Sequence, residues 1–258
     1  MSATPETFCF CTLALRPKYR LLTQQLAENL EQFAPGIQLV VLTDEPKDFA
    51  NNRNVLAFQH QQQGILHCYH DKRFPIERAL DQFDAAILID ADTKITAAIS
   101  PQLIWQGGLT ARHQENLVEH VSQYNPERLS AVEKVAAKLD INPKDVTYVG
   151  ESLFVVRKNQ GKEREFLKYW GMIGRYLELQ NVHAGSGIAI GLAAFKAGFP
   201  IIHDQQIDEI DNARKHIDAS YQKKGRTRWE KISRRMGYHY RLNKTRLLAL
   251  TNFSFYYL

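Results

Sequence analysis

Apolar residues in the N-terminal third of the chain fall either in short continuous runs or at helical spacing. Residues 7–15 form an apolar, aromatic-rich run, and residues 19–33 place leucines and a phenylalanine on one helical face. Residues 37–42 are apolar throughout, as in a strand that is buried on both faces. Residues 75–83 again have helical spacing, and residues 85–89 form another buried run. This order predicts two consecutive β-α-β units.

The same alternation continues through the middle of the chain. We predict helices at residues 130–139, 162–179 and 188–197, a strand at residues 148–156 that Gly-Glu-Ser interrupts, and a short strand at residues 201–202. Strands that alternate with helices favour an α/β fold with a mostly parallel central sheet flanked by helices, and ligands bind outside the carboxyl ends of its strands. We therefore predict one domain over residues 1–218 and a basic, aromatic and helical C-terminal tail over residues 219–258.

Composition limits the class of protein. The chain of 258 residues is 44% hydrophobic and 24% charged, which is usual for a globular protein and excludes disorder of the whole chain. Its three cysteines complete neither a disulfide framework nor a cysteine zinc site, so we expect Cys9 and Cys11 to pack on one face of a strand. Residues 1–10 lack the pattern of a secretory signal. The apolar residues 184–202 include a lysine and a proline, which indicates a buried helix rather than a membrane span, and we expect a cytoplasmic protein.

The sharpest local feature is an Asp-x-Asp sequence at the end of an apolar run. Residues 85–89 lead directly into Asp90-Ala91-Asp92, at the end of a strand where a parallel sheet presents ligands. Two carboxylates there suit a hard divalent ion, Mn²⁺ or Mg²⁺, that shares its remaining positions with phosphate oxygens. The alternative is a solvated turn that caps a helix.

Two enzyme classes place Asp-x-Asp at the end of a strand. In phosphatases of the haloacid dehalogenase type the motif lies near the start of the chain, with a small residue where this chain has Lys94. In nucleotide-sugar glycosyltransferases of the GT-A fold, two β-α-β units that bind the nucleoside precede the motif. The order of elements therefore favours a metal-dependent glycosyltransferase, with the phosphatase as the alternative.

Five segments resemble the retaining glycosyltransferases of family 6, which includes the blood-group A/B transferases and α-1,3-galactosyltransferases. Residues 12–19 resemble the family's first strand and its nucleoside-contacting segment, and residues 40–44 resemble its second strand, which ends in Val-Phe-Thr-Asp. Residues 87–92 stand where the family has an apolar strand and Asp-Val-Asp. Residues 148–154 resemble the family's Tyr-Tyr-x-Gly-x-x-Phe strand, and residues 183–187 fall at its His-Asp-Glu-Ser-His loop. The resemblance implies a GT-A fold and a nucleotide-sugar donor, with a UDP-sugar favoured. It also implies a glycan or lipid-linked acceptor, and it leaves the sugar and the stereochemical outcome open.

The resemblance implies a set of donor-binding residues. Thr12, Ala14 and Tyr19 stand in the nucleoside-contacting segment, where the Tyr19 ring would stack on the base; packing in the core is the alternative. Lys72 and Arg73 precede the helix that leads to the Asp-x-Asp strand. In this fold that region supplies a cation to the diphosphate, and a solvated face is the alternative.

Histidines add two candidates to these sites. We assign Asp90 and Asp92 to the metal, and Asp90 also to the donor, with His203 as the third metal ligand because it follows the last predicted strand. Many GT-A enzymes place a ligand there, and a neutral imidazole beside a carboxylate suits that role. His113, beside a Gly-Gly pair, is assigned to an acceptor loop, with a surface histidine as the alternative.

The loop at residues 183–187 departs from the family. We assign its His183 and Ser186 to the acceptor, but Ala184 and Gly185 stand where the family has an aspartate and a glutamate. The catalytic carboxylate of the family therefore has no counterpart in this loop. We assign a catalytic role to Glu151, as a general base or by orienting an acceptor hydroxyl within hydrogen-bond reach. Alternatively, Glu151 lies at the rim of the site and forms an ion pair with a basic side chain.

The net charge of +5 conceals an asymmetry. Residues 221–246 hold ten basic residues against one acidic residue, a net +9, which leaves −4 on the rest of the chain. The basic segment could close over the donor diphosphate, as C-terminal Lys and Arg do in the family that the chain resembles. It could instead dock on an anionic membrane, with the aromatic residues 253–257 at the interface. The third interpretation is a nucleic-acid-binding protein without catalysis. It ranks behind the transferase and the phosphatase, because the −4 body would repel a phosphate backbone and the Asp-x-Asp sequence would have no role.

Overall fold

A seven-stranded sheet forms the centre of the molecule. The computed structural model describes residues 7–219 and 227–258, and within them the strand order is β10-β6-β9-β4-β1-β2-β3, with two small sheets that join β5 to β11 and β7 to β8. The strands are β1 (Phe8–Ala14), β2 (Leu39–Thr43), β3 (Val55–Gln59), β4 (Ala85–Ile89), β5 (Thr93–Ile95), β6 (Gly108–Ala111), β7 (Gln114–Asn116), β8 (Thr147–Val149), β9 (Leu153–Arg157), β10 (Ile201–Ile202) and β11 (Arg214–His216). The α-helices are α1 (Pro17–Phe33), α2 (Arg73–Leu80), α3 (Leu117–Tyr124), α4 (Leu129–Lys138), α5 (Lys162–Leu179), α6 (Gly187–Ala197), α7 (Gln206–Ala213), α8 (Arg228–Ala249) and α9 (Phe253–Tyr257).

The direction of the strands confirms the predicted fold class. Parallel pairs join β1 to β2 and to β4, and β2 to β3. By contrast, β9 runs antiparallel to both of its neighbours, β4 and β6. The prediction of one interrupted strand over residues 148–156 was wrong, because β8 belongs to a small sheet and β9 to the central one. The Gly-Glu-Ser segment between them is the connection from one sheet to the other, and it lies beside the carboxyl end of β4.

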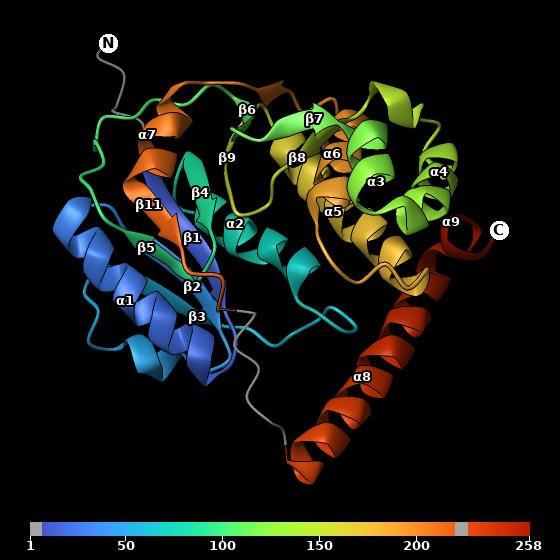
Figure 1. Ribbon diagram of the computed structural model, residues 1–258, viewed down its shortest axis with the longest axis horizontal. Coiled ribbons are helices and arrows are strands. Elements are labelled where there is room, and N and C mark those ends of the chain that lie inside the picture. Colours follow the sequence, from blue (N-terminus) through green and yellow to red (C-terminus); the bar gives the residue numbers. More distant parts are fainter. Residues whose placement is uncertain (1–6, 220–226) are drawn as a thin grey trace.

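Two hydrophobic clusters cover the two faces of the sheet, and alternation along β1 divides its side chains between them. Phe8 and Phe10 pack with residues of α1 and α7. Cys9 and Cys11 point to the opposite face and pack with residues of α2, α5 and α6. Both thiols are buried, which confirms the prediction that they share one face of a strand. Figure 1 shows α1 on one side of the sheet and α2 with α5 on the other.

Glycines let α6 approach β8 closely. A Cβ at Gly187 would lie 2.4 Å from the carbonyl oxygen of Val149, and one at Gly191 would lie 2.1 Å from that of Thr147. Larger side chains would push the helix away from this strand. The helix is buried over most of its length, which confirms the prediction for residues 184–202. Within residues 7–219 and 227–258, every helix is too short or too polar to cross a membrane.

The basic tail is helical, as predicted. α8 begins with a capping box in which Thr227 and Glu230 bond reciprocally to each other's backbone amides. In Figure 1 it runs along the lower right edge of the molecule, and the short α9 follows at its end. Lys223, Lys224 and Arg226 of the predicted basic segment lie outside the described residues.

A buried carboxyl group under this tail makes stability depend on pH. Glu178 of α5 is 6% exposed, and its Oε1 accepts a hydrogen bond from the Ile65 amide at 3.0 Å. Burial raises its pKa to about 8. An unfolded glutamate titrates near pH 4.3, so between about pH 4 and pH 8 only the folded state keeps the proton. The free energy of unfolding therefore falls as the pH rises through this interval.

Replacement of Glu178 by glutamine should remove this dependence, because the amide keeps an oxygen acceptor for Ile65 and never ionises. At pH 8 we expect Glu178→Gln to raise the free energy of unfolding by on the order of 5 kcal/mol, with little change near pH 4. Urea unfolding at both pH values measures the difference. Glu165→Gln, at an exposed position of the same helix, is the matched control. Equal stabilities of Glu178→Gln and wild type at pH 8 would show that Glu178 ionises normally.

Candidate active site

The two aspartates of the Asp-x-Asp sequence lie where several strand ends meet. Asp90 follows β4, and its amide donates to the Ser152 carbonyl at 3.2 Å, just before β9 begins. Ile89 is opposite Leu153 in the antiparallel pair, so the carboxyl end of β4 adjoins the amino end of β9. This arrangement brings the Asp-x-Asp sequence beside the segment that contains Glu151.

His216 completes a group of three possible metal ligands with Asp90 and Asp92. One ligand atom from each lies within 4.8 Å of the other two, and Asp92 Oδ1 is 3.8 Å from His216 Nδ1. The pairing of β11 with β5 places His216 opposite Thr93, next to Asp92 in the chain. Two carboxylates and one imidazole suit a divalent transition ion with mixed oxygen and nitrogen ligands, and among the predicted ions this donor set favours Mn²⁺ over Mg²⁺.

The predicted third ligand, His203, lies elsewhere. It follows β10 at the outer edge of the central sheet, separated from β4 by β6 and β9, and its side chain is exposed. His216 therefore occupies the place that we assigned to His203. The sequence did not point to His216, because a strand as short as β11 gives no indication of which strand it pairs with.

Lys72 joins the Asp-x-Asp sequence to the Glu151 segment. Its Nζ lies 2.6 Å from Asp90 Oδ1 and donates to the Glu151 carbonyl at 3.2 Å. Burial lowers the pKa of Lys72, but the charges of Asp90 and Glu151 more than offset this, so the pKa ends above its usual value. Burial also raises the pKa of Asp90, and the Lys72 ammonium works in the opposite direction. A protonated Lys72 thus stands at the aspartates, as the predicted role in donor binding requires.

Two other predicted residues, Glu151 and Ser186, meet on the far side of Lys72. The Ser186 amide and hydroxyl both donate to Glu151 Oε2. Gly185 has a φ of 79°, and a Cβ there would lie 3.9 Å from Glu151 Oε1. A positive φ of this size belongs to the left-handed region, which glycine adopts more readily than other residues. The carboxylate next to this loop is therefore that of Glu151, which comes from a different part of the chain.

The predicted nucleoside-contacting segment lies at the same edge of the sheet. Tyr19 is half-buried in the first turn of α1, and burial together with the nearby charge of Asp92 raises the pKa of its phenol. Ala14, the last residue of β1, and Thr12, inside the same strand, are both buried. Of the three residues, Tyr19 is the one whose side chain lies near the aspartates and is partly open to solvent.

Arg16, which the sequence did not single out, holds the ends of β1 and β2 together. Its amide donates to both carboxylate oxygens of Asp44 at 3.1 Å. Its φ of 77° is unusual for a residue other than glycine, and such backbone strain clusters at functional sites. The side chain is exposed, so a guanidinium stands beside Tyr19 at the sheet edge.

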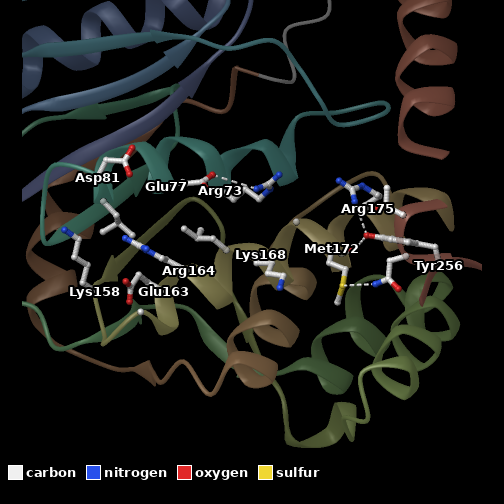
Figure 2. A pocket seen from close by; sticks show the side chains of 16 residues that line it. Arg73, Glu77, Asp81, Lys158, Glu163, Arg164, Lys168, Met172, Arg175 and Tyr256 are labelled. Carbon is white, nitrogen blue, oxygen red and sulfur yellow. Dashed lines mark hydrogen bonds and ion pairs between the residues drawn. The ribbon is translucent and has the colours of Figure 1, made fainter. Parts of the chain in front are cut away.

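Arg73 is separated from Lys72, with which it was predicted to contact the diphosphate. It points into a concavity between α2, α5 and α9 (Figure 2). There its guanidinium lies 3.7 Å from the centre of the Phe74 ring and 4.0 Å from Glu77. Arg175 lines the same concavity and donates to the Tyr256 hydroxyl at 3.2 Å. Consecutive residues at the start of α2 thus face different parts of the surface.

The predicted acceptor histidines lie on two sides of this edge. His113 contacts the edge of the Tyr148 ring, with 6.0 Å between ring centres. Burial raises the pKa of Tyr148 to about 12, and the charges of Glu151 and Glu115 act in the same direction. His183 instead contacts Tyr238 of α8 edge-on, with 6.5 Å between ring centres. The site therefore has Tyr148 on one flank and the basic tail on the other.

The contact between Lys72 and Asp90 makes a prediction for stability and metal response. Both side chains are partly buried, so Lys72→Met should leave the Asp90 carboxylate without a counter-charge and lower the free energy of unfolding by about 2–3 kcal/mol. Mn²⁺ should then raise the melting temperature of the variant more than that of wild type, because the ion supplies the missing charge. Differential scanning fluorimetry with and without Mn²⁺ measures both effects. Lys134→Met, at an exposed position of α4, should change neither; an unchanged Lys72→Met would contradict the interpretation.

Comparison with known proteins supports the fold. No protein-family model and no curated protein sequence matches this chain. Among solved structures, the chain is similar to the galactosyltransferase LgtC in complex with donor and acceptor sugar analogs, with a TM-score of 0.52 and 12% sequence identity. The similarity covers 81% of this chain and 87% of LgtC. It does not single out family 6. At this identity it shows the fold alone, and the fold of this chain is that of the GT-A glycosyltransferases.

Proposed function

We propose that the protein is a metal-dependent glycosyltransferase that moves a sugar from a nucleotide-sugar donor to an acceptor hydroxyl. The observation that carries the proposal is the convergence of Asp90, Asp92 and His216 at the carboxyl end of β4 in a chain with the GT-A fold. The fold similarity to a galactosyltransferase favours a transferase over the phosphatase alternative. The resemblance to family 6 remains part of the proposal, as does a UDP-sugar as donor.

In the proposed site these three residues would hold Mn²⁺. The bound ion would neutralise charge on the diphosphate that leaves the sugar. Lys72 would contribute a second positive charge, because its ammonium already lies between Asp90 and the Glu151 carbonyl. Arg16 and Tyr19 at the ends of β1 and α1 would bind the nucleotide, the tyrosine by stacking on the base.

The acceptor would lie on the side of Glu151. Ser186 fixes Glu151 Oε2 with two hydrogen bonds, which orients the carboxylate before any substrate binds. The second oxygen, Oε1, is then available to accept a hydrogen bond from a hydroxyl of a glycan or lipid-linked acceptor. We assign Glu151 the role of orienting this hydroxyl or removing its proton, and we assign His113 and His183 to the flanks of the acceptor site.

Thermal stabilisation tests the proposal directly. The full chain is mixed with Mn²⁺ and a panel of sugar nucleotides and nucleoside diphosphates, and we expect at least one to raise the melting temperature in the presence of the ion. Asp90→Ala should abolish the response. If none of the compounds stabilises the protein, and Asp90→Ala behaves as wild type, the glycosyltransferase proposal is wrong.

The outward face of α8 supports a second part of the proposal, peripheral binding to an anionic membrane. Its exposed apolar side chains are Trp229, Ile232, Met236, Tyr240 and Leu247, which are 49–80% exposed. Their spacing of three, four and seven residues places them on one stripe of a helix. Thr245 and Ala249, which are buried against the body, lie on the opposite side. Arg and Lys flank the stripe, as is typical of a helix that lies in a lipid interface.

The charge of the tail fits the same partner. Each Lys or Arg near an anionic surface contributes about 1 kcal/mol to binding, and the tail carries a net +9 between residues 221 and 246. The exposed face of α8 is centred on apolar side chains rather than on cations, which favours a lipid surface over nucleic acid. A cytoplasmic protein attached to the inner leaflet follows from this proposal.

The tail also has contacts that suit a lid over the donor. The residues that lead into the tail lie directly at the aspartates. The Ile217 amide donates to the Asp92 carbonyl at 2.8 Å, and the amide of Ala219, the first residue of the tail, donates to Asp92 Oδ2 at 2.9 Å. Further along, Arg241 of α8 donates to the Ile65 carbonyl at 3.1 Å. Membrane binding and closure of the site are compatible, since the apolar stripe faces away from these contacts.

A further inference from the structure

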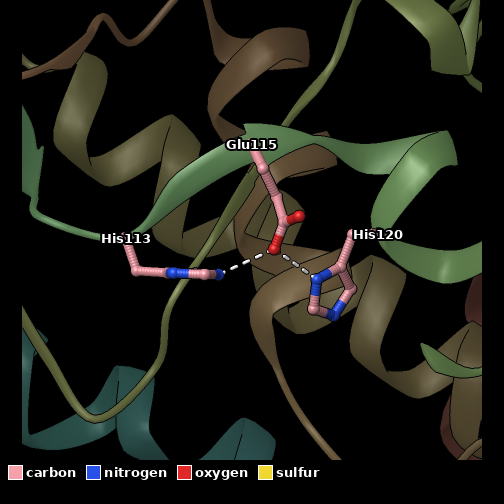
Figure 3. Close-up of side chains that lie close together, drawn as sticks. All are labelled: His113, Glu115 and His120. Carbon is pink, nitrogen blue, oxygen red and sulfur yellow. Dashed lines mark hydrogen bonds and ion pairs between the residues drawn. The ribbon is translucent and has the colours of Figure 1, made fainter. Parts of the chain in front are cut away.

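A second group of possible metal ligands lies apart from the Asp-x-Asp sequence, at the start of α3. Glu115 Oε1 is 2.7 Å from His113 Nε2 and 2.6 Å from His120 Nδ1, and the three ligand atoms lie within 4.8 Å of one another. Figure 3 shows both imidazoles directed at the same carboxylate oxygen. Two imidazole nitrogens and one carboxylate oxygen thus lie close enough together to bind one ion.

Secondary structure holds two of the three residues, Glu115 and His120, in place. Glu115 is the central residue of β7 and pairs with Tyr148 of β8. His120 lies in the first turn of α3, whose start is fixed by Asn116, because the Asn116 side chain accepts hydrogen bonds from the Val118 and Glu119 amides. The backbone that carries two of the ligands is therefore set by a strand pairing and a helix cap.

The rings themselves are also supported. Tyr148 stacks on His120 with 3.5 Å between ring centres and 13° between planes. The His113 carbonyl accepts a hydrogen bond from the Gly150 amide at 3.0 Å, and a Cβ at Gly150 would lie 2.9 Å from His113 Cβ. Glycine at this position thus allows β7 and the Gly150 segment to approach closely. The three ligand atoms thus lie within 4.8 Å of one another on a supported framework.

We propose that His113, Glu115 and His120 form a binding site for a transition-metal dication of the zinc class. Two imidazoles and one carboxylate are a donor set that proteins use for Zn²⁺, and nitrogen ligands disfavour Mg²⁺ and Ca²⁺. The donor set also differs from that of Asp90, Asp92 and His216, which has one imidazole. The two groups would therefore select different ions.

The geometry gives this ion an open position. Structural zinc sites are closed by four protein ligands, whereas three ligands leave a position for water or for an oxygen of a bound molecule. His113 is largely exposed, so solvent reaches the group. Tyr148, which stacks on His120, is three residues before Glu151 in the chain. The zinc site lies on the flank that we assign to the acceptor, but its existence does not depend on the glycosyltransferase proposal.

Zinc titration of the full chain tests the site. Isothermal titration calorimetry with Zn²⁺, in saturating Mn²⁺ to occupy the aspartates, should show one zinc per chain. Glu115→Gln and His113→Gln should each weaken binding by about tenfold or more. His203→Gln, at an exposed histidine outside both groups, and His216→Gln should leave it unchanged. Unchanged zinc binding in both Glu115→Gln and His113→Gln would overturn the proposal, as would its loss in His216→Gln.

A measurement on the wild-type protein needs no variant to fold. X-ray absorption at the zinc K-edge, with one equivalent of Zn²⁺ and saturating Mn²⁺, counts the imidazoles bound to zinc. We expect two, together with oxygen ligands. A count of one imidazole would place the zinc at His216 and overturn the proposal, and so would a count of none. If zinc binds through two imidazoles but no nucleotide stabilises the protein, the proposed function is refuted and this inference stands.

Discussion

Asp92→Asn is expected to weaken Mn²⁺-dependent binding of a nucleoside diphosphate by about a hundredfold and to lower the rate of sugar transfer by about a thousandfold or more. The asparagine keeps one oxygen but loses the negative charge that an ion would require, and a bound ion supplies several kcal/mol of transition-state stabilisation. The fold should survive, since an amide oxygen still accepts the hydrogen bond from the Ala219 amide that Asp92 Oδ2 accepts now. Calorimetry and a radiolabelled sugar-transfer assay measure the two effects.

Two histidine variants sharpen this experiment. His216→Gln should weaken Mn²⁺-dependent binding by about tenfold, whereas His203→Gln should bind and react as wild type because it lies beyond β6 and β9. The opposite result, with His203 required and His216 dispensable, would mean that the sequence-based assignment was right and that the group at β11 is not the metal site. Normal binding in Asp92→Asn would contradict the metal-dependent mechanism itself.

Removal of residues 220–258 should abolish sedimentation with anionic vesicles while thermal stabilisation by Mn²⁺ and nucleotide persists. The removed residues include the basic segment and the whole exposed stripe of α8, so both the electrostatic and the apolar contributions to membrane binding disappear. Binding of the full chain should weaken steeply with salt and be absent from neutral vesicles. Loss of the nucleotide response on truncation would instead support the lid.

A subtler variant separates the stripe from the rest of the tail. Truncation also removes Ala249 and Tyr256, which are buried against the body, and so exposes apolar surface. In the full chain, Trp229→Ser combined with Met236→Ser should reduce vesicle binding about tenfold or more, because two large apolar side chains are lost. Ser254→Ala, in the short α9, should have no effect. Equal vesicle binding by the stripe variant and wild type would contradict docking through this face.

Much of the fold could be predicted because the signals are local. The apolar runs that became β1, β2 and β4 were found because strands buried on both faces are continuous in sequence. The strand β3 was missed although residues 55–58 are all apolar, and at the edge of the sheet these side chains are only half-buried. The split between β8 and β9 was missed because it depends on their partner strands, which come from distant parts of the chain.

The site divides in the same way. Asp90, Asp92, Lys72 and Glu151 were identified from motifs and from their places beside predicted strands, and the structure brings these residues together. His216 was missed and Arg73 was grouped with Lys72, because sequence position does not say which way consecutive side chains point at the start of a helix. The group around Glu115 was also missed, because its three side chains come together only when β7 continues into α3.

By itself, the sequence determined the layered α/β fold, the placement of two carboxylates at the end of a buried strand, and the division of charge between an acidic body and a basic tail. These follow from periodicity and composition, which are properties of neighbouring residues. Only the tertiary structure decided which histidine joins the aspartates, that Ser186 fixes Glu151, and that the apolar stripe of α8 faces away from the body. Those outcomes depend on pairings between segments far apart in the chain, whose energies come from packing and hydrogen bonds that local sequence does not encode.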